Sequence, residues 1–168
     1  MHISKYRQGF LVAMLLSAVF LLTGCFAIGT SPDGVSLFAL KENAARKLSV
    51  DINQLVIDSS GLEWIVRKEG KGDKPKKGEG IVANYTGYLL ENGKKFDSSY
   101  DRDRPFVEAI GMGKVIKGWD IAFLGMRAGE RRVLFIPPEL AYGERGAGQK
   151  IPPNATLVFD VELIRIIK

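Results

Sequence analysis

Alternating hydrophobic and polar positions predict a series of β-strands in the second half of the chain. Strands are predicted at residues 62–68, 81–90, 95–98, 131–136 and 157–166. In the last of these, every second residue from 157 to 163 is apolar, whereas Asp160 and Glu162 share the opposite face. This alternation is typical of an antiparallel sheet with one face on a core and the other in water.

Glycine and proline divide these strands from one another. The Gly/Lys/Pro-rich stretch at 70–79 breaks the chain after the first strand, and the loop at 143–153 precedes the last. Asn92-Gly93 predicts a type I′ hairpin turn between the second and third strands, because both residues tolerate a positive φ. We therefore expect neighbouring strands to be antiparallel.

A short helix is predicted at 117–124, with Ile121 and Leu124 facing inward. The predicted fold class is therefore α+β, with an antiparallel sheet closed over one short helix. No internal repeat is evident in the sequence.

A further amphipathic segment lies at 36–48, before the strands. Its apolar residues fall near one helical face, and its charged residues lie elsewhere. A helix of this length is marginal on its own and needs a partner surface. A docking or dimerising helix, a frayed helix and a flexible linker all remain open at this point.

The first residues have the pattern of a secretory signal. Lys5 and Arg7 precede an uncharged apolar run at 10–22, which is too short for a transmembrane helix of about 20 residues. The run ends at Leu22-Thr23-Gly24-Cys25, which resembles the bacterial lipobox Leu-x-Gly-Cys. That resemblance implies cleavage before Cys25 and lipid on its sulfur. The alternative is an ordinary buried cysteine after a signal anchor.

These boundaries give three expected parts. Residues 1–24 form the lipoprotein signal peptide, residues 25–60 the lipidated cysteine with a tether and helix, and residues 61–168 the folded domain. The lipid anchor would place the protein in a bacterial cell envelope. The residue after the cysteine is Phe26 and not an Asp. By analogy with lipoprotein sorting in Gram-negative bacteria, this favours the outer membrane.

Composition narrows the function further. Hydrophobic residues make up 46% and charged residues 26% of the 168-residue chain, which is ordinary for a globular protein. The net charge of +5 arises from 24 basic residues interleaved with 19 acidic ones, so no basic patch indicates nucleic acid as a partner.

The residue inventory excludes several kinds of chemistry. The single histidine, His2, lies in the predicted signal peptide, and the single cysteine is the predicted lipid site. Ser-His-Asp or Cys-His hydrolysis and His/Cys zinc sites therefore lack a required residue. No nucleotide-binding glycine motif is present either. We expect neither a metal nor a cofactor, and a function that depends on pocket shape and hydrogen bonds.

Residues 85–159 are rich in aromatic side chains, each of which alone fits a core as well as a pocket. Three segments decide between these interpretations: VANYTGYLLENGKKFDSSYDRDRPF, VIKGWDIAFLGMRAGERRVLFIPPELAYGERGAG and IPPNATLVFDVEL. In order and spacing they resemble the FKBP-type peptidyl-prolyl cis-trans isomerases. The resemblance covers residues 61–168 and implies a five- or six-stranded antiparallel half-barrel around one helix.

The resemblance also implies a site. By position in these segments, the catalytic residues would be Asp97, Tyr142 and Ile116, and the substrate-binding residues would be Tyr85, Phe96, Arg102, Phe106, Val115, Trp119, Ile151 and Phe159. Trp119 would be the pocket floor, and the Ile116 N–H and the Tyr142 hydroxyl would bind substrate carbonyls. Arg102 would orient Tyr85 and Asp97.

The implied activity is rotation of X–Pro bonds in envelope or secreted polypeptides, with macrolides as potential inhibitors. A non-catalytic peptide-binding or chaperone module with the same pocket is the alternative. Three rim positions depart from the family pattern: Glu108, Ala147 and Lys150. They bear on peptide preference and macrolide affinity rather than on catalysis.

Overall fold

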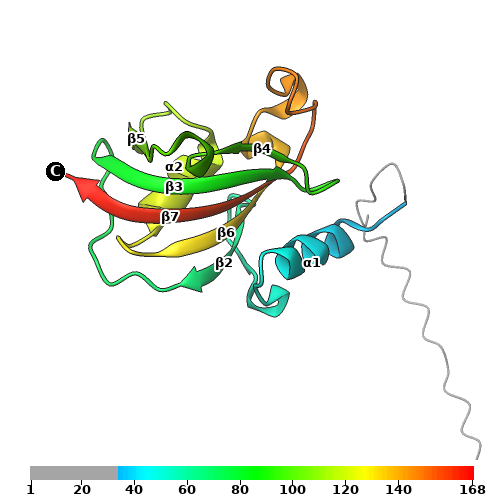
Figure 1. Cartoon of the computed structure of the whole chain (residues 1–168), viewed down its shortest axis with the longest axis horizontal. Helices are drawn as coiled ribbons and strands as arrows, with labels where there is room; N and C mark the ends of the chain where they lie inside the picture. Colours follow the sequence, from blue (N-terminus) through cyan, green and yellow to red (C-terminus); the bar gives the residue numbers. More distant parts are fainter. Residues whose placement is uncertain (1–33) are drawn as a thin grey trace, which may run out of the picture.

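A seven-stranded antiparallel sheet organises the part of the chain that the computed structural model describes, residues 34–168 (Figure 1). Its strands are β1 (Val56–Ile57), β2 (Glu63–Lys68), β3 (Gly80–Leu89), β4 (Lys95–Ser98), β5 (Phe106–Ala109), β6 (Arg131–Ile136) and β7 (Leu157–Ile167). The order across the sheet is β1-β2-β6-β7-β3-β4, and β5 pairs with β3 beyond the end of β4. The predicted α+β class is confirmed.

The two longest strands, β3 and β7, form the middle of the sheet. They pair from Gly80 opposite Ile167 to Leu89 opposite Leu157, with one register shift at Val82/Ala83. Helix α2 (Lys117–Gly125) lies against one face of this pair (Figure 1). Its buried residues, which include Trp119 and Phe123, join the inward-facing side chains of β3, β6 and β7 in the main core.

Helix α1 (Leu37–Lys47) covers part of the opposite face, so the segment at 36–48 is a helix with a partner surface in its own domain (Figure 1). The Ser36 hydroxyl caps it by accepting a hydrogen bond from the Ala39 N–H at 3.2 Å. Ala45, only 1% exposed, packs in a second apolar cluster with side chains of β2, β6 and β7. An ion pair of 2.6 Å between Lys41 and Glu63 fixes the helix to β2.

This packing corrects the expectation that one face of the sheet is wet. Val158 and Ile65, on the face opposite α2, are each 1% exposed because α1 covers them. Asp160 on the same face is also buried, since Arg131 and Arg67 bind its carboxylate at 2.6–2.7 Å. Only the outer part of this face is in contact with water.

The hairpin after β3 differs from the predicted type I′ turn. Only Gly93 has a positive φ, of 65°, and the connection runs from Leu90 to Lys94. Asn92 acts through its side chain, which accepts a hydrogen bond from the Lys94 N–H at 2.9 Å. Asn92-Gly93 therefore does lie in the hairpin connection, but the loop is longer than the two residues of a type I′ turn.

The other predicted elements are present within one or two residues at each end. Sequence patterns missed β1 and β5, which are two and four residues long, so the sheet has more strands than the five or six expected. They also missed the short 3₁₀ helices η1 (Ile52–Gln54), η2 (Tyr100–Arg102), η3 (Pro138–Leu140) and η4 (Gly143–Arg145). Elements of this length carry too little periodicity to stand out.

None of the helices in residues 34–168 has the length and apolar content to cross a bilayer. None of the described His, Cys, Asp and Glu side chains form a group that could hold a metal ion. The predicted signal peptide and Cys25 lie outside the described residues.

The second cluster yields a test of α1 packing. Ala45→Asp would bury a carboxylate against apolar side chains, and we expect it to lower the free energy of unfolding by about 1–3 kcal/mol. Urea denaturation measures this change. Asn43→Asp, on the exposed side of the same helix, is the matched control and should stay within about 0.5 kcal/mol of the parent chain. Equal stability of both variants would contradict the packing of α1.

Candidate functional site

Five aromatic side chains from five different elements meet between α2 and the sheet. This aromatic cage consists of Tyr85 from β3, Phe96 from β4, Phe106 from β5, Trp119 from α2 and Phe159 from β7. Trp119 is the common partner, with ring centroids 4.9 Å from Tyr85, 5.0 Å from Phe106 and 5.2 Å from Phe159. All three pairs are edge-to-face, an arrangement that favours the ring quadrupoles and holds each ring in one orientation.

A glycine in β3 makes room for two of these rings. A Cβ at Gly87 would lie 2.6 Å from Phe96 Cζ and 2.7 Å from Phe159 Cε1. Any side chain here would therefore displace the Phe96–Phe159 pair, whose centroids are 5.5 Å apart. Gly87 thus lets β4 and β7 place their aromatic residues at the same end of the cage.

The cage has one polar corner. Asp97, next to Phe96 on β4, accepts hydrogen bonds from the Tyr85 hydroxyl and from Nη1 of Arg102. Nη2 of Arg102 also donates to the Tyr85 hydroxyl at 2.6 Å, and the guanidinium lies 5.7 Å from the centre of the Tyr85 ring. The three side chains close a triangle of hydrogen bonds, in which Arg102 contacts both Tyr85 and Asp97.

These contacts set the protonation states. Burial by itself would raise the pKa of the Asp97 carboxyl group, but the hydrogen bonds from Arg102 and Tyr85 outweigh it, and the pKa lies below its ordinary value. Burial, together with Asp97, raises the pKa of Tyr85 to about 12. At neutral pH the corner is therefore a carboxylate held by a neutral phenol and a guanidinium.

Two free hydrogen-bond donors lie near the cage. Ile116 is the N-cap residue of α2, and its N–H makes no hydrogen bond within residues 34–168. The Tyr142 hydroxyl likewise has no partner among the described residues. Burial raises the pKa of Tyr142, and the nearby charge of Asp97 raises it further. Both groups can therefore donate to a ligand without breaking a bond within the described residues.

The structure brings the sequence-predicted site residues together. Tyr85, Trp119, Ile151 and Phe159 are buried in the main core, and Phe96, Phe106, Val115 and Ile116 pack against it. Arg102 and Asp97 form the polar corner, and Tyr142 is 41% exposed. Within the described residues, the Trp119 Nε1–H is the one buried side-chain polar atom without a hydrogen-bond partner. The Trp119 N–H is therefore the one polar group of the aromatic interior that is left without a partner among the described residues.

Sequence reasoning missed Asp120, which shapes the wall of the site. Its carboxylate accepts hydrogen bonds from the Gly111 N–H at 2.7 Å and from the Gly113 N–H at 2.8 Å. These bonds tie the loop before Ile116 to the first turn of α2. The sequence did contain a signal for this role. Asp120 is an acidic residue in the first turn of a helix, and the helix begins shortly after Gly111-Met112-Gly113.

The three rim positions are also placed. Glu108 pairs with Lys114 at 3.1 Å, and the Lys150 ammonium donates to the carbonyl oxygen of Phe96 at 3.2 Å. Ala147 pairs with Ile151 in a β-bridge that closes the loop on itself. Lys150 therefore connects the 143–153 loop to β4 at the edge of the cage.

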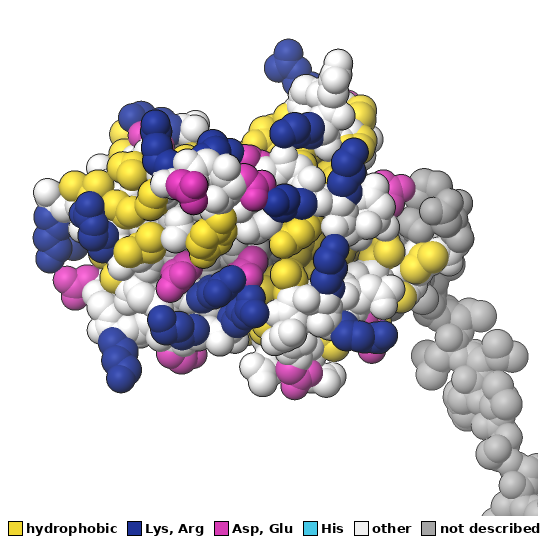
Figure 2. Space-filling model, viewed as in Figure 1, with side chains coloured by type: hydrophobic (Ala, Val, Ile, Leu, Met, Phe, Trp, Pro, Cys, Tyr) yellow, Lys and Arg dark blue, Asp and Glu magenta, His cyan; other side chains and the backbone are white. Residues whose placement is uncertain are grey.

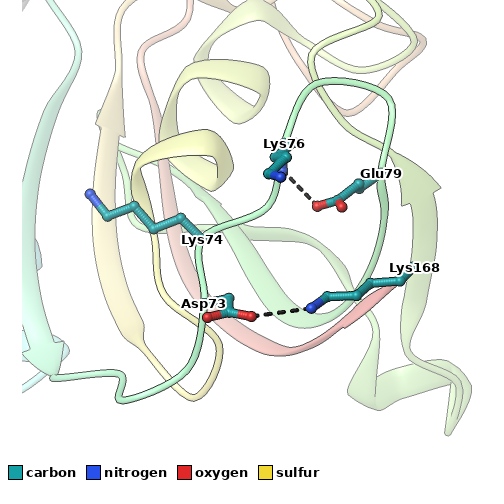
Figure 3. Close-up of a pocket in the computed structure, with 5 residues that line it drawn as sticks. All are labelled: Asp73, Lys74, Lys76, Glu79 and Lys168. Carbon is teal, nitrogen blue, oxygen red and sulfur yellow. Dashed lines mark hydrogen bonds and ion pairs between the residues drawn. The ribbon is translucent and has the colours of Figure 1, made fainter.

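A hollow of about 400 Å³ lies elsewhere, and none of the cage residues line it (Figure 3). Its lining residues are Asp73, Lys74, Lys76, Glu79 and Lys168. Lys168 extends toward Asp73, with 3.2 Å between the charged atoms, and the Lys76 N–H donates to Glu79 (Figure 3). The Asp73 and Lys168 charges pair with each other at an exposed site, and none of the residues predicted for the substrate line this hollow.

Comparisons with known proteins agree with this geometry. Residues 71–164 match the family described as FKBP-type peptidyl-prolyl cis-trans isomerase. An FK506-binding protein of Neisseria meningitidis is 54% identical over 99 residues, which are 59% of this chain and 90% of that protein. The mouse peptidyl-prolyl cis-trans isomerase FKBP2 is 57% identical over 93 residues, which are 55% and 66% of the two chains.

Solved structures give the same result. The crystal structure of AtFKBP13 is similar with a TM-score of 0.63 and 48% sequence identity, over 66% of this chain and 97% of that one. The crystal structure of FkpA from Escherichia coli has a TM-score of 0.64 and 40% identity, over 76% of this chain and 58% of that one.

Proposed function

Because this chain belongs to the FKBP-type peptidyl-prolyl cis-trans isomerases, we propose that its aromatic cage binds the proline of a polypeptide and lowers the barrier to rotation of the preceding bond. The chain is a peptidyl-prolyl isomerase, and proline-containing polypeptides are its substrates. The observation that carries the proposed site is the apolar cage around Trp119 with two free donors beside it.

The reaction needs no bond cleavage. Amide resonance gives the X–Pro bond a rotational barrier of about 18–20 kcal/mol, so uncatalysed exchange takes tens of seconds. In the twisted state, resonance and its charge separation are lost. A dry apolar surface therefore favours that state over the planar one, and about 1.4 kcal/mol of such preference is a tenfold gain in rate.

Each part of the site has a proposed role in this step. The proline ring would rest on Trp119, and the Ile116 N–H and Tyr142 hydroxyl would hold carbonyl oxygens of the substrate. The carboxylate of Asp97 would face the carbonyl carbon of the rotating amide, held in place by its bonds to Arg102 and Tyr85. None of these roles transfers a proton. No feature of the site favours a purely non-catalytic binding module.

We further propose that the protein is a lipid-anchored enzyme of the bacterial envelope. Support comes from Lys5 and Arg7, the apolar run at 10–22 and the tetrapeptide that ends at Cys25. With Phe26 after the cysteine, we favour the outer membrane of a Gram-negative cell. Relatives are named FK506-binding proteins, and the retained cage is the reason to propose macrolides as inhibitors here.

The site assignment is tested by two substitutions that delete polar groups with little loss of packing. Asp97→Ala removes a charged hydrogen-bond acceptor worth about 1.5–3 kcal/mol, so we expect kcat/KM to fall at least about tenfold. Tyr142→Phe removes one neutral donor and should cost about two- to tenfold. A protease-coupled assay on short Leu-Pro and Phe-Pro peptides measures both.

Asp101→Ala and Tyr100→Phe are matched controls for these variants. Both residues are exposed and lie outside the cage, so their kcat/KM should equal that of the parent chain. If Asp97→Ala and Tyr142→Phe fold and also keep the parent value, the site is misassigned.

The pH dependence follows from the protonation states. The pKa of Asp97 is lowered and those of Tyr85 and Tyr142 are raised, so none of the three titrates near neutrality. We expect kcat/KM on an uncharged peptide to stay within about twofold from roughly pH 6 to 8.5. Because folding lowers the pKa of Asp97, its ionised carboxylate stabilises the folded state at pH values above the pKa of the unfolded chain, which is about 4. This stabilisation is lost as the pH falls through the lower pKa of the folded chain.

A pH series with circular dichroism at each point measures this profile. A tenfold fall centred near pH 7 in folded protein would mean that a titrating group takes part, and the proposed mechanism would have to be abandoned.

The lipid anchor is tested at Cys25. Several acyl chains hold a protein firmly on a membrane, whereas one holds it only marginally. We expect Cys25→Ser to leave the precursor unprocessed or to release the protein from the membrane fraction, with kcat/KM unchanged. Fractionation and intact mass report the outcome, and an unmodified Cys25 in the parent protein would rule out the anchor.

A further inference from the structure

The first turn of α1 and the residue before its N-cap expose apolar side chains that neither core cluster includes. Val35 is 38% exposed, Leu37 37% and Phe38 59%. This tip of α1, defined here as Val35, Leu37 and Phe38, lies at the opposite end of the described chain from β5 (Figure 1). Figure 2 shows apolar side chains on the surface at the same end.

The rest of α1 is held firmly on the domain. Lys41, one turn after Leu37, pairs with Glu63 at 2.6 Å, and both side chains are largely buried. The Lys47 ammonium donates to the Gly93 carbonyl at 3.0 Å at the other end of the helix. The tip is therefore fixed relative to the aromatic cage, and whatever binds it also orients the site.

The chain before the tip indicates what lies near it. Between Cys25 and Leu40 the only charged residue is Asp33, and the first turn of α1 has no acidic side chain. Ten residues such as 26–35 can span at most about 35 Å, the length of a fully extended chain. A lipid on Cys25 would therefore keep the tip close to the bilayer surface, at a high effective concentration.

A bilayer fits this tip better than a second copy of the chain does. Three side chains at a helix end offer far less than the roughly 800 Å² per partner of a stable protein interface. A lipid interface requires no complementary shape, and apolar and aromatic side chains enter its headgroup region readily.

We infer that Val35, Leu37 and Phe38 insert into the interface of the bilayer that holds the lipid, and that this contact orients the isomerase domain on the membrane. The inference rests on the proposed lipid anchor. It makes the tip a second membrane contact, so that the domain is held in one orientation instead of turning freely on its tether.

The experiment uses the full lipidated chain in vesicles of phosphatidylethanolamine and phosphatidylglycerol that contain brominated lipid. Phe38→Trp places an indole in the tip, and Val107→Trp places one on β5, where Val107 is 57% exposed at the opposite end of the described chain. The emission of the parent chain, with Trp64 and Trp119, is subtracted from both. We expect the bromine atoms to quench most of the added emission at position 38 and none at position 107.

The other outcomes overturn the inference in distinguishable ways. If the chain floats with the vesicles but position 38 is not quenched, the tip does not touch the bilayer, and the anchor stands. If the intact mass shows no lipid on Cys25 and the chain does not float, the anchor fails and the inference fails with it. If the emission at position 38 shifts to the blue without vesicles and with rising protein concentration, a second copy covers the tip.

Discussion

The close approach of α2 to the sheet is the constraint on which the site depends. A Cβ at Gly118 would lie 2.6 Å from Cγ2 of Ile136, so only glycine lets the helix lie this near β6. That distance places the next residue, Trp119, at edge-to-face contact with Tyr85, Phe106 and Phe159. One missing side chain thus determines the depth of the cage.

The cage serves both as core and as binding surface. Trp119 is 5% exposed and Phe159 3%, so the side chains proposed to meet the substrate also bury the centre of the domain. Rings packed this closely cannot reorient without breaking several aromatic contacts. The polar corner is built differently, from hydrogen bonds among Tyr85, Asp97 and Arg102 at the partly exposed edge. A preorganised apolar surface with one fixed carboxylate suits a reaction whose transition state is less polar than its ground state.

The fold could be predicted from the sequence where the pattern was long and regular. The alternation in 157–166 gave β7 almost to the residue. The helical pattern in 36–48 matched the bounds of α1 but left open whether that segment is a stable helix or a linker. The burial of Ile65 and Val158 could not be predicted, because it depends on a helix from a distant segment that covers them. The family resemblance supplied the predicted site residues. The structure added Gly87, which leaves room for the rings of Phe96 and Phe159. It also added Asp120, whose carboxylate holds the backbone of Gly111 and Gly113. Neither role can be read from the sequence, because each depends on residues that only the fold brings near. The lipid anchor and the domain boundaries remain predictions.

The position of β7 has a consequence for how the protein is made. This strand, Leu157–Ile167, is the last element along the chain, yet it lies in the middle of the sheet between β6 and β3. Its partner β3 precedes it by most of the domain, so the central pairing joins segments far apart in sequence, which slows folding. The core cannot close during synthesis until this strand has left the ribosome. Until then β6 and β3 each lack the strand that lies between them, so their facing edges carry unpaired backbone N–H and C=O groups.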